Sequence, residues 1–396
     1  MLHEDSGLPP PAADAVAHSA RLCAAIAEDI AGNGGWISFA RYMDLALYAP
    51  GLGYYRAGSA KFGMHGDFVT APEISPLFGR TLAQQLAALV STAMPEVLEL
   101  GAGSGKLARD VLGELASLGK LPARYCILEL SGELRDRQKK TLAELGPDIL
   151  QRVSWLDALP KRFRGTVIAN EVLDALPVHV VVWRGDRHQG IFERGVSGTA
   201  QDGFAWEERP AAGALLQAAQ AIAGAGIMGE GEYLSEISLA GTALIASLAD
   251  AMEQGVAIFI DYGFPRREYY HSQRAMGTLM CHYRHRAHGD PFHLPGLQDI
   301  TAHVDFTALS AAASAAGLAC LGYATQAQFL INCGITEVLA RVPPDDVARY
   351  LPLASEAQKL LSPSEMGDLF KVIALGKNAG AALPGFSSGD QRARLE

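Results

Sequence analysis

The sequence lacks three features that would assign it to familiar protein classes. Its five cysteines are odd in number and none lies in a C-x-x-C pair, which favours a reduced protein of the cytoplasm. It has no excess of basic residues: 33 basic and 43 acidic side chains give a net charge of −10, which argues against nucleic-acid binding. No apolar run approaches the roughly 20 residues that span a bilayer, so we expect no membrane insertion.

Targeting and metal signals are also missing. The acidic, proline-rich start, Met1–Pro11, resembles neither a signal peptide nor an Arg-rich transit peptide. The segment Cys281–His293 contains several histidines, but no second ligand pair with zinc spacing accompanies it. We therefore predict no metal site, and we expect this segment to be a solvated loop covering the active site. With 396 residues, 49% of them hydrophobic, the chain can bury a large core in one or two domains.

One glycine-rich stretch carries most of the information that is present. The apolar run at residues 96–100 is followed by three alternating glycines, in Glu99-Leu-Gly-Ala-Gly-Ser-Gly105. A dinucleotide fingerprint would need glycine where Lys106 stands, and a phosphate-binding P-loop would need Ser or Thr where Leu107 stands. The remaining pattern, E-x-G-x-G-x-G, resembles motif I of the class I S-adenosylmethionine (SAM)-dependent methyltransferases. The cofactor-binding residues predicted here are Glu99, Gly101, Gly103 and Gly105.

Beyond this loop, apolar strands alternate with amphipathic helices, which predicts an α/β fold with a parallel sheet. Residues 178–209 alternate as in an antiparallel meander, and residues 265–304 show little periodicity. We expect a helical N-terminal region at 1–80, a main domain at 81–378 with insertions at about 178–235 and 264–305, and a disordered tail at 379–396. Strands are predicted at 97–100, 125–130, 153–156, 166–170, 256–262, 318–324 and 370–375, and Ile37–Leu47 is predicted to be a helix.

Acidic residues stand at the ends of three predicted strands. Glu129 lies at the end of the second strand, where a carboxylate in nucleoside-binding folds accepts hydrogen bonds from ribose hydroxyls. Asp157 follows the third strand, at the position that would face an adenine amino group. Asn170, Glu171 and Asp174 follow the fourth strand, and ligands sit at the carboxyl ends of such strands. Two acids three residues apart could orient a guanidinium whose nitrogen must attack a methyl group.

Six motifs in a fixed order resemble the MidA family, the complex I assembly-factor methyltransferases. They are Phe62–Ser75, the glycine loop, Asn170–Pro177, Ile260–Gly263, Asp299–Phe306 and Met366–Val372. The resemblance implies a class I, Rossmann-like fold with a seven-stranded, mostly parallel sheet and a helical cap. It also implies SAM as methyl donor and methylation of a protein arginine, with a complex I subunit as a candidate partner. It places Asp67, Thr70, Pro72 and Ser75 beside the cofactor and adds Glu73 to the catalytic candidates; His303 is a further candidate because histidine titrates near neutral pH.

Three functions therefore remain open from the sequence. The first is a methyltransferase acting on a protein arginine, in which the cap and insertions form the acceptor groove. The second is a methyltransferase of a small amine or metabolite, with Asn170 accepting a hydrogen bond from the attacking amine. The third is a SAM-binding assembly chaperone with little catalysis. The sequence leaves the oligomeric state open, a homodimer included.

Overall fold

The computed structural model describes residues 8–56, 70–185, 190–228, 231–380 and 382–396. The chain divides into two compact units, each built from several segments. Unit 1 contains Met1–Phe68, Asp174–Gly241 and Arg266–His303, and unit 2 contains Val69–Leu173, Thr242–Pro265 and Val304–Glu396. The residues from Val69 to residue 80, expected in the N-terminal region, thus belong to unit 2.

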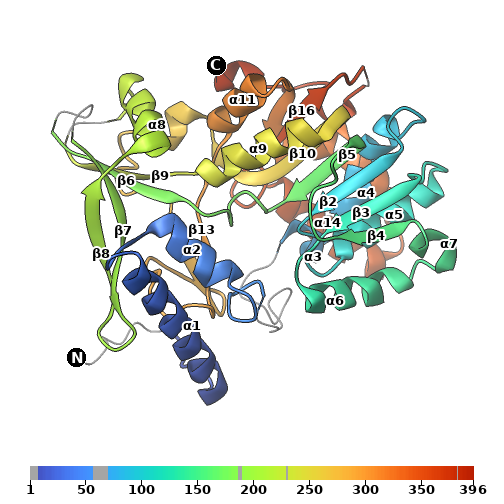
Figure 1. Ribbon diagram of the computed structural model, residues 1–396. Coiled ribbons are helices and arrows are strands. Elements are labelled where there is room, and N and C mark those ends of the chain that lie inside the picture. The colour runs from blue at the N-terminus through green and yellow to red at the C-terminus, as the bar shows by residue number, and fades with distance from the viewer. Residues whose placement is uncertain (1–7, 57–69, 186–189, 229–230, 381) are drawn as a thin grey trace. The chain divides into compact units, whose positions relative to one another are not determined.

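Unit 2 is built on an eight-stranded sheet (Figure 1). Its main path has the order β15-β16-β10-β5-β2-β3-β4, and the two-residue strand β14 (Val304–Asp305) pairs beside β10. The predicted seven strands correspond to the main path and miss β14. Five neighbouring strands run parallel, whereas β16 is antiparallel to both β10 and β15. The strands are β2 (Glu96–Leu100), β3 (Arg124–Leu128), β4 (Val153–Leu156), β5 (Phe163–Asn170), β10 (Met252–Phe264), β15 (Ala319–Thr325) and β16 (Phe370–Lys377).

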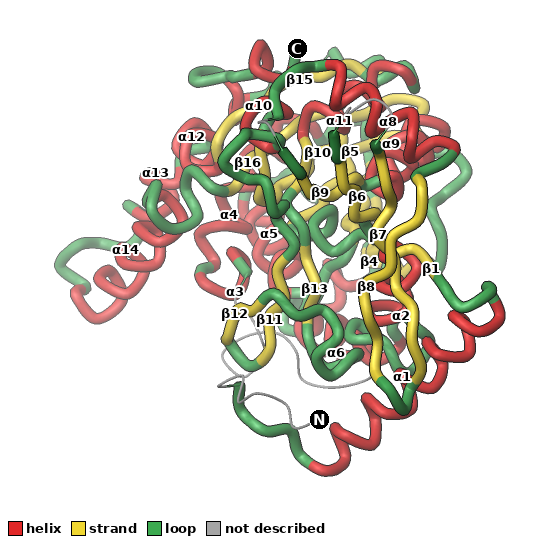
Figure 2. Tube along the Cα trace, turned by 90° about the vertical axis from the view of Figure 1, so that its left-hand side faces the viewer, coloured by secondary structure: helices red, strands yellow, loops and turns green. Residues whose placement is uncertain are grey.

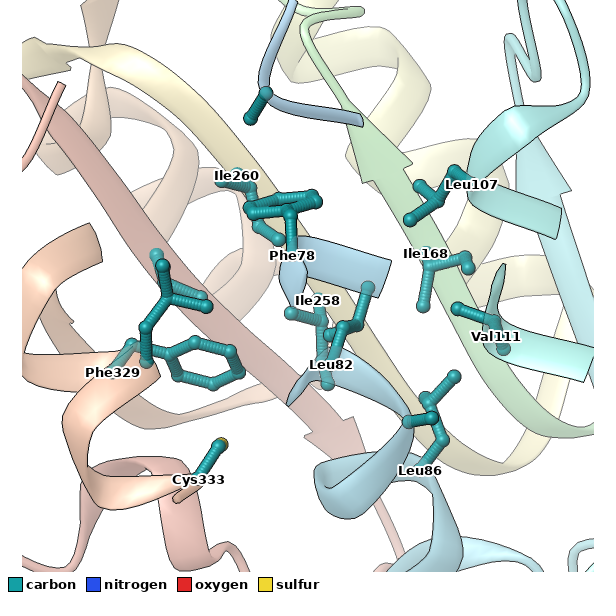
Figure 3. Packing of buried hydrophobic residues seen from close by; sticks show 14 of the residues in the cluster. Phe78, Leu82, Leu86, Leu107, Val111, Ile168, Ile258, Ile260, Phe329 and Cys333 are labelled. Carbon is teal, nitrogen blue, oxygen red and sulfur yellow. The ribbon is translucent and has the colours of Figure 1, made fainter. Parts of the chain in front are cut away.

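Helices α4 (Pro76–Leu89), α5 (Lys106–Ser117) and α12 (Gln326–Asn332) share a buried apolar cluster with the central strands. Leu82 and Leu86 of α4 lie between Ile258 of β10 and Val111 of α5 (Figure 3). Because alternate residues of a strand face opposite sides, Ile258 and Ile260 both point into this cluster. The apolar faces of α4 and α5 thus pack on the central strands of the sheet. The remaining helices with residues in unit 2 are α3 (Ala71–Ile74), α6 (Gly132–Ala143), α7 (Pro147–Leu150), α9 (Leu239–Ala251), α11 (Phe306–Ala315), α13 (Ile335–Leu339) and α14 (Val347–Leu361).

Unit 1 contains a five-stranded sheet with the order β1-β7-β6-β9, in which β8 also pairs with β7. All its pairings are antiparallel, and β7 and β8 lie side by side along their length (Figure 2). A smaller sheet has the order β12-β11-β13. The elements are α1 (Ala13–Gly32), β1 (Ile37–Ser38), α2 (Phe39–Tyr48), β6 (His179–Trp183), β7 (Ile191–Thr199), β8 (Gly203–Pro210), α8 (Gly213–Gly224), β9 (Tyr233–Ile237), α10 (Arg266–Tyr269), β11 (Met280–Tyr283), β12 (Arg286–His288) and β13 (Asp299–Thr301).

Strand β6 is buried on both faces, which explains its unbroken Val-Val-Val-Trp sequence. Val180 and Val182 pack into the apolar cluster formed with α1 and α2. Trp183 is fully buried, and its indole Nε1 donates to the carbonyl of Ala219 in α8 at 3.2 Å. No helix among the described residues is long and apolar enough to cross a bilayer.

Three local predictions differ from the structure. The segment Cys281–His293, expected to be a solvated loop, contains β12 and most of β11, and Cys281 and Tyr283 are buried. The helix expected from Ile37 begins at Phe39, because Ile37 and Ser38 pair with β7 and the Ser38 hydroxyl caps the helix by accepting from the backbone N–H of Arg41 at 3.1 Å. The tail expected to be disordered instead forms short 3-10 helices at Pro384–Phe386 and Arg392–Leu395. Phe386 is 8% exposed and packs on Phe329, with ring centroids 5.3 Å apart.

Candidate functional site

The glycine loop follows β2 and leads directly into α5. Gly101, Gly103 and Gly105 all have positive φ, at 63°, 52° and 84°, a region that side chains with a Cβ rarely adopt. A Cβ at Gly101 would lie 2.9 Å from Val172 Cγ2, and one at Gly105 would lie 3.0 Å from Gln138 Cα. The protein's own packing thus requires two of these glycines, and the resulting bend brings bare backbone to the carboxyl edge of the sheet.

Helix α6 holds this loop from one side. The buried amide of Gln138 donates to the carbonyl of Gly103 and to Glu129 Oε2, both at 3.1 Å, and accepts from Trp155 Nε1 at 2.8 Å. Thr141 donates to the carbonyl of Ser104 at 2.9 Å. Gln138 was missed in the sequence because a glutamine on an amphipathic helix is usually solvent-exposed. Its position nine residues after Glu129, on the helix that follows β3, was the available signal.

Glu129 and Asp157 stand where the ends of β3 and β4 were predicted to bind the nucleoside. The Glu129 carboxylate also accepts from the backbone N–H of Ser131 at 2.9 Å, and burial raises its pKa. Asp157 is exposed and pairs with Arg135 at 2.6 Å. Arg135 also donates to the carbonyls of Glu129 and Leu156 at 2.6 and 2.9 Å. Arg135, which was also not predicted from the sequence, thus connects the ends of β3 and β4 through its hydrogen bonds.

Glu99 lies beneath the loop and is only 1% exposed. Tyr125 of β3 donates its hydroxyl to Glu99 Oε2 at 2.6 Å. Burial raises the pKa of Glu99 to about 7, although the hydrogen bond from Tyr125 opposes the rise. A carboxyl group with this pKa ionises readily when a cation is placed near it, which is the property expected of a residue facing a methionine ammonium group.

The short helix α3 approaches the glycine loop from the other side. Glu73 accepts from the Ser104 hydroxyl and pairs with Lys106 Nζ at 3.4 Å. Its charge is therefore balanced by Lys106, which favours a role in positioning the loop over the catalytic one predicted for it.

Ser75 is fully buried and caps α4 by accepting from Leu77 N at 3.2 Å. Thr70 is the N-cap residue of α3 and Pro72 is buried within that helix, while Asp67 lies outside the described residues.

The end of β5 brings Asn170 and Glu171 to the same edge. Glu171 Oε1 accepts from Asn170 Nδ2 at 3.1 Å and from the backbone N–H of Ala71 at 3.3 Å. Glu171 has φ 51°, a conformation that is strained for a residue with a side chain. The other amide atom, Asn170 Oδ1, is buried and has no hydrogen-bond partner among the described residues. A buried acceptor of this kind indicates an absent donor.

Asp174 and His303 belong to unit 1, and each has a hydrogen bond within that unit's segments. Asp174 is 5% exposed, and its backbone carbonyl accepts from Ala302 N at 3.0 Å. Burial raises the pKa of Tyr55, and the negative charges of Asp299 and Asp174 raise it further. The backbone N–H of His303 donates to the Thr278 hydroxyl at 3.1 Å. Glu171 belongs to unit 2, so the predicted pair of acids three residues apart is divided between the units. Among the described residues no group of three His, Cys, Asp or Glu side chains is placed to hold a metal ion.

Comparisons with known proteins identify the family of this chain. A family described as "Putative S-adenosyl-L-methionine-dependent methyltransferase" matches residues 77–324, more than half of the chain. The chain belongs to this family. The resemblance to the MidA family is thereby confirmed, and the protein is a SAM-dependent methyltransferase of the α/β methyltransferase fold.

Individual relatives cover most of the chain. It is 30% identical over 377 residues to the mouse protein named Protein arginine methyltransferase NDUFAF7, mitochondrial, covering 86% of this chain and 81% of the relative. The zebrafish protein of the same name is 28% identical, with coverages of 85% and 82%. A crystal structure from Burkholderia thailandensis, bound to S-adenosyl-homocysteine, is 51% identical with a TM-score of 0.92, covering 98% of this chain and 99% of that one.

The residues present fit the family's cofactor. The glycine bend leaves backbone accessible at the edge of the sheet, and Glu129 offers acceptor oxygens at the end of the neighbouring strand. Glu99 supplies a carboxyl group whose raised pKa lets it ionise when a cation is near. The glycine loop, Glu99 and Glu129 therefore offer chemistry that suits SAM, and Asn170 and Glu171 stand at the end of the neighbouring strand β5.

Proposed function

We propose that this methyltransferase transfers the methyl group of SAM to an arginine side chain of a protein. The observation that carries the proposal is the pair of acceptors at the end of β5. They are the Glu171 carboxylate and the buried Asn170 Oδ1, which has no hydrogen-bond partner in the part of the chain that the structure describes. A guanidinium has five N–H donors and no acceptor, so it complements this pair. The mouse and zebrafish relatives, named as protein arginine methyltransferases, support the same acceptor.

The residues have separate tasks in this proposal. SAM supplies an electrophilic methyl group on a sulfonium. Glu171 binds the guanidinium through charge-assisted hydrogen bonds and turns one nitrogen toward the methyl group. Asn170 Oδ1 accepts a further N–H, and its Nδ2 donates to Glu171 Oε1, which fixes the carboxylate's orientation. Because arginine remains protonated in water, the attacking nitrogen must give up a proton. The Glu171 carboxylate accepts this proton as the nitrogen–methyl bond forms and the methyl–sulfur bond breaks.

Labelled SAM tests this function directly. The purified protein is incubated with methyl-labelled SAM and a cell lysate, and labelled proteins are digested and sequenced by mass spectrometry. We expect methyl groups on arginine, and we expect Glu171→Gln to bind SAM with unchanged affinity while labelling falls about a hundredfold or more. Label found on lysine or only on small molecules would refute the proposal, and the latter would favour methylation of a small amine.

We further propose a protein substrate connected with respiratory complex I assembly, and a reaction in the cytoplasm. The six motifs that resemble the MidA family support the first proposal. The five cysteines, all of them free, support a reducing compartment. Identification of the labelled protein in the same lysate experiment tests the substrate, and fractionation of the host cell tests the compartment.

A further inference from the structure

Glu171 has a backbone conformation that glycine would adopt without strain. Its φ of 51° lies in the left-handed region, where a Cβ crowds the neighbouring carbonyl oxygen. Such a residue keeps this conformation only where the surrounding structure imposes it. Since a glycine would fit here more easily, the presence of glutamate indicates that the side chain is needed, and the question is what holds its backbone.

The carboxylate of Asp261 is in contact with the backbone that leaves this turn. Oδ2 accepts from the N–H groups of Val172 and Leu173, at 3.2 and 2.9 Å, and Oδ1 accepts from Tyr262 N at 2.9 Å. Asp261 is only 1% exposed, so water does not compete for these bonds. Hydrogen bonds from backbone N–H groups to a buried carboxylate are among the stronger ones in proteins.

The sheet register explains why Asp261 is in this position. Strands β5 and β10 are parallel, and Ile260 is opposite Asn170. Glu171 N still donates to the Ile260 carbonyl at 2.9 Å, which is the last bond of the ladder. The next two N–H groups, of Val172 and Leu173, both turn to the single oxygen Oδ2 of Asp261. An extended strand directs successive N–H groups to opposite sides, so these two can converge only because the chain bends at Glu171.

We propose that Asp261 is the positioning residue of the transfer reaction: it enforces the left-handed turn that directs the Glu171 carboxylate toward the acceptor. The inference rests on the proposed role of Glu171 in binding the acceptor. Asp261 itself contacts backbone and moves no proton. The segment is further confined because Gly101 of the cofactor loop packs against Val172, so the turn is fixed from two sides.

A comparison of glycine with alanine at position 171 measures the enforced turn without any substrate. Glu171→Gly and Glu171→Ala both lack the carboxylate and differ mainly in their tolerance of positive φ. In the otherwise unchanged protein, the glycine variant should unfold roughly 2 °C or more above the alanine variant. In an Asp261→Asn background this advantage should vanish or reverse, because alanine is favoured over glycine once the backbone relaxes.

Asp390 provides the matched control, since its carboxylate also accepts two backbone N–H groups, from Tyr323 at 3.2 Å and Arg392 at 3.1 Å. In an Asp390→Asn background the advantage of glycine over alanine should persist. If Asp261→Asn fails to fold, Asp261→Glu, which moves the acceptor oxygens outward, is put through the same comparison. An undiminished advantage of glycine in the Asp261 variant that folds overturns the proposal.

Kinetics then separates positioning from general destabilisation. With Glu171 intact, Asp261→Asn should lower kcat about tenfold or more and leave the Kd for SAM within about twofold, at a temperature where both proteins are folded. Unchanged kcat overturns the positioning role even if the thermal result holds. If the unaltered protein transfers no methyl to arginine, the proposed function fails, whereas the thermal comparison still decides whether Asp261 enforces the turn.

Discussion

Gln138→Leu tests whether α6 maintains the shape of the cofactor loop. The fully buried side-chain amide of Gln138 donates to the Gly103 carbonyl and to Glu129 Oε2, and it accepts from Trp155 Nε1. Leucine has a similar size, so the change removes polar partners more than volume. The variant should therefore report on these three hydrogen bonds and not on a cavity.

The size of the effect follows from the kinds of bond that are lost. Two neutral hydrogen bonds contribute about 1 kcal/mol each and one to a charged carboxylate about 1.5–3 kcal/mol. Burial of the leucine side chain offsets about 1 kcal/mol of this sum. We expect the free energy of unfolding to fall by about 3 kcal/mol. Because Glu129 and Gly103 both lose a partner, the Kd for SAM should rise about tenfold, equivalent to about 1.4 kcal/mol.

Urea unfolding and isothermal titration calorimetry with SAM measure the two quantities. Gln84→Leu is the control, because Gln84 is also a helical glutamine of unit 2 and donates to Glu114 Oε1 at 2.6 Å. Its Kd for SAM should remain unchanged. If Gln138→Leu binds SAM as tightly as the unaltered protein, the loop keeps its shape without these hydrogen bonds from α6.

Three further variants test other parts of the site. Burial raises the pKa of Glu99 from an ordinary 4.5 to about 7, so between these pH values the folded state holds a proton that the unfolded chain releases. The free energy of unfolding should therefore fall as the pH rises from about 4.5 to about 7. Glu99→Gln should remove this fall in urea titrations across that range. Glu73→Gln removes the ion pair between Glu73, whose side chain is 14% exposed, and Lys106, whose side chain is 27% exposed. It should lower the free energy of unfolding by about 1 kcal/mol or less and weaken SAM binding in calorimetry. Gly105→Ala meets both a φ of 84° and a close contact, whereas Gly119→Ala meets a φ of 65° in open space; thermal unfolding should show a larger loss for the former.

The parts of the site that could be predicted lie on single strands and their ends. Apolar runs that stop at Glu99, Glu129 or Asn170 predicted strands β2, β3 and β5, and parallel strands bring such ends to one edge. The alternating glycines predicted a sharp bend, because positive φ is a property of the individual residue. These signals are local, so no knowledge of tertiary contacts was needed to predict the strand ends and the glycine loop.

The parts that were missed depend on contacts between distant segments. Gln138 is an ordinary helical glutamine until α6 packs on the glycine loop, and its position nine residues after Glu129 was the one local signal for it. Asp261 was noted in the sequence only as part of the motif Ile260–Gly263, and its partners Val172 and Leu173 lie 88 or more residues away. The C-terminal tail, rich in small and polar residues, is anchored by Phe386 and by a bond from Gly385 N to Gln85 at 3.0 Å, contacts that composition does not reveal.

Helix α3 links the two halves of the site, and this has a consequence for catalysis. Its first residue, Ala71, donates its backbone N–H to Glu171, and two residues later Glu73 binds Ser104 and Lys106 beside the glycine loop. The glycine loop and Glu171, the residue proposed to bind the acceptor, thus both contact one short helix. Residues that share partners in this way give non-additive effects when they are changed together. A distortion of the glycine loop should therefore also displace Glu171. We expect a double variant of Glu73 and Glu171 to lose less methyl-transfer activity, as a free energy, than the sum of the losses of the two single variants.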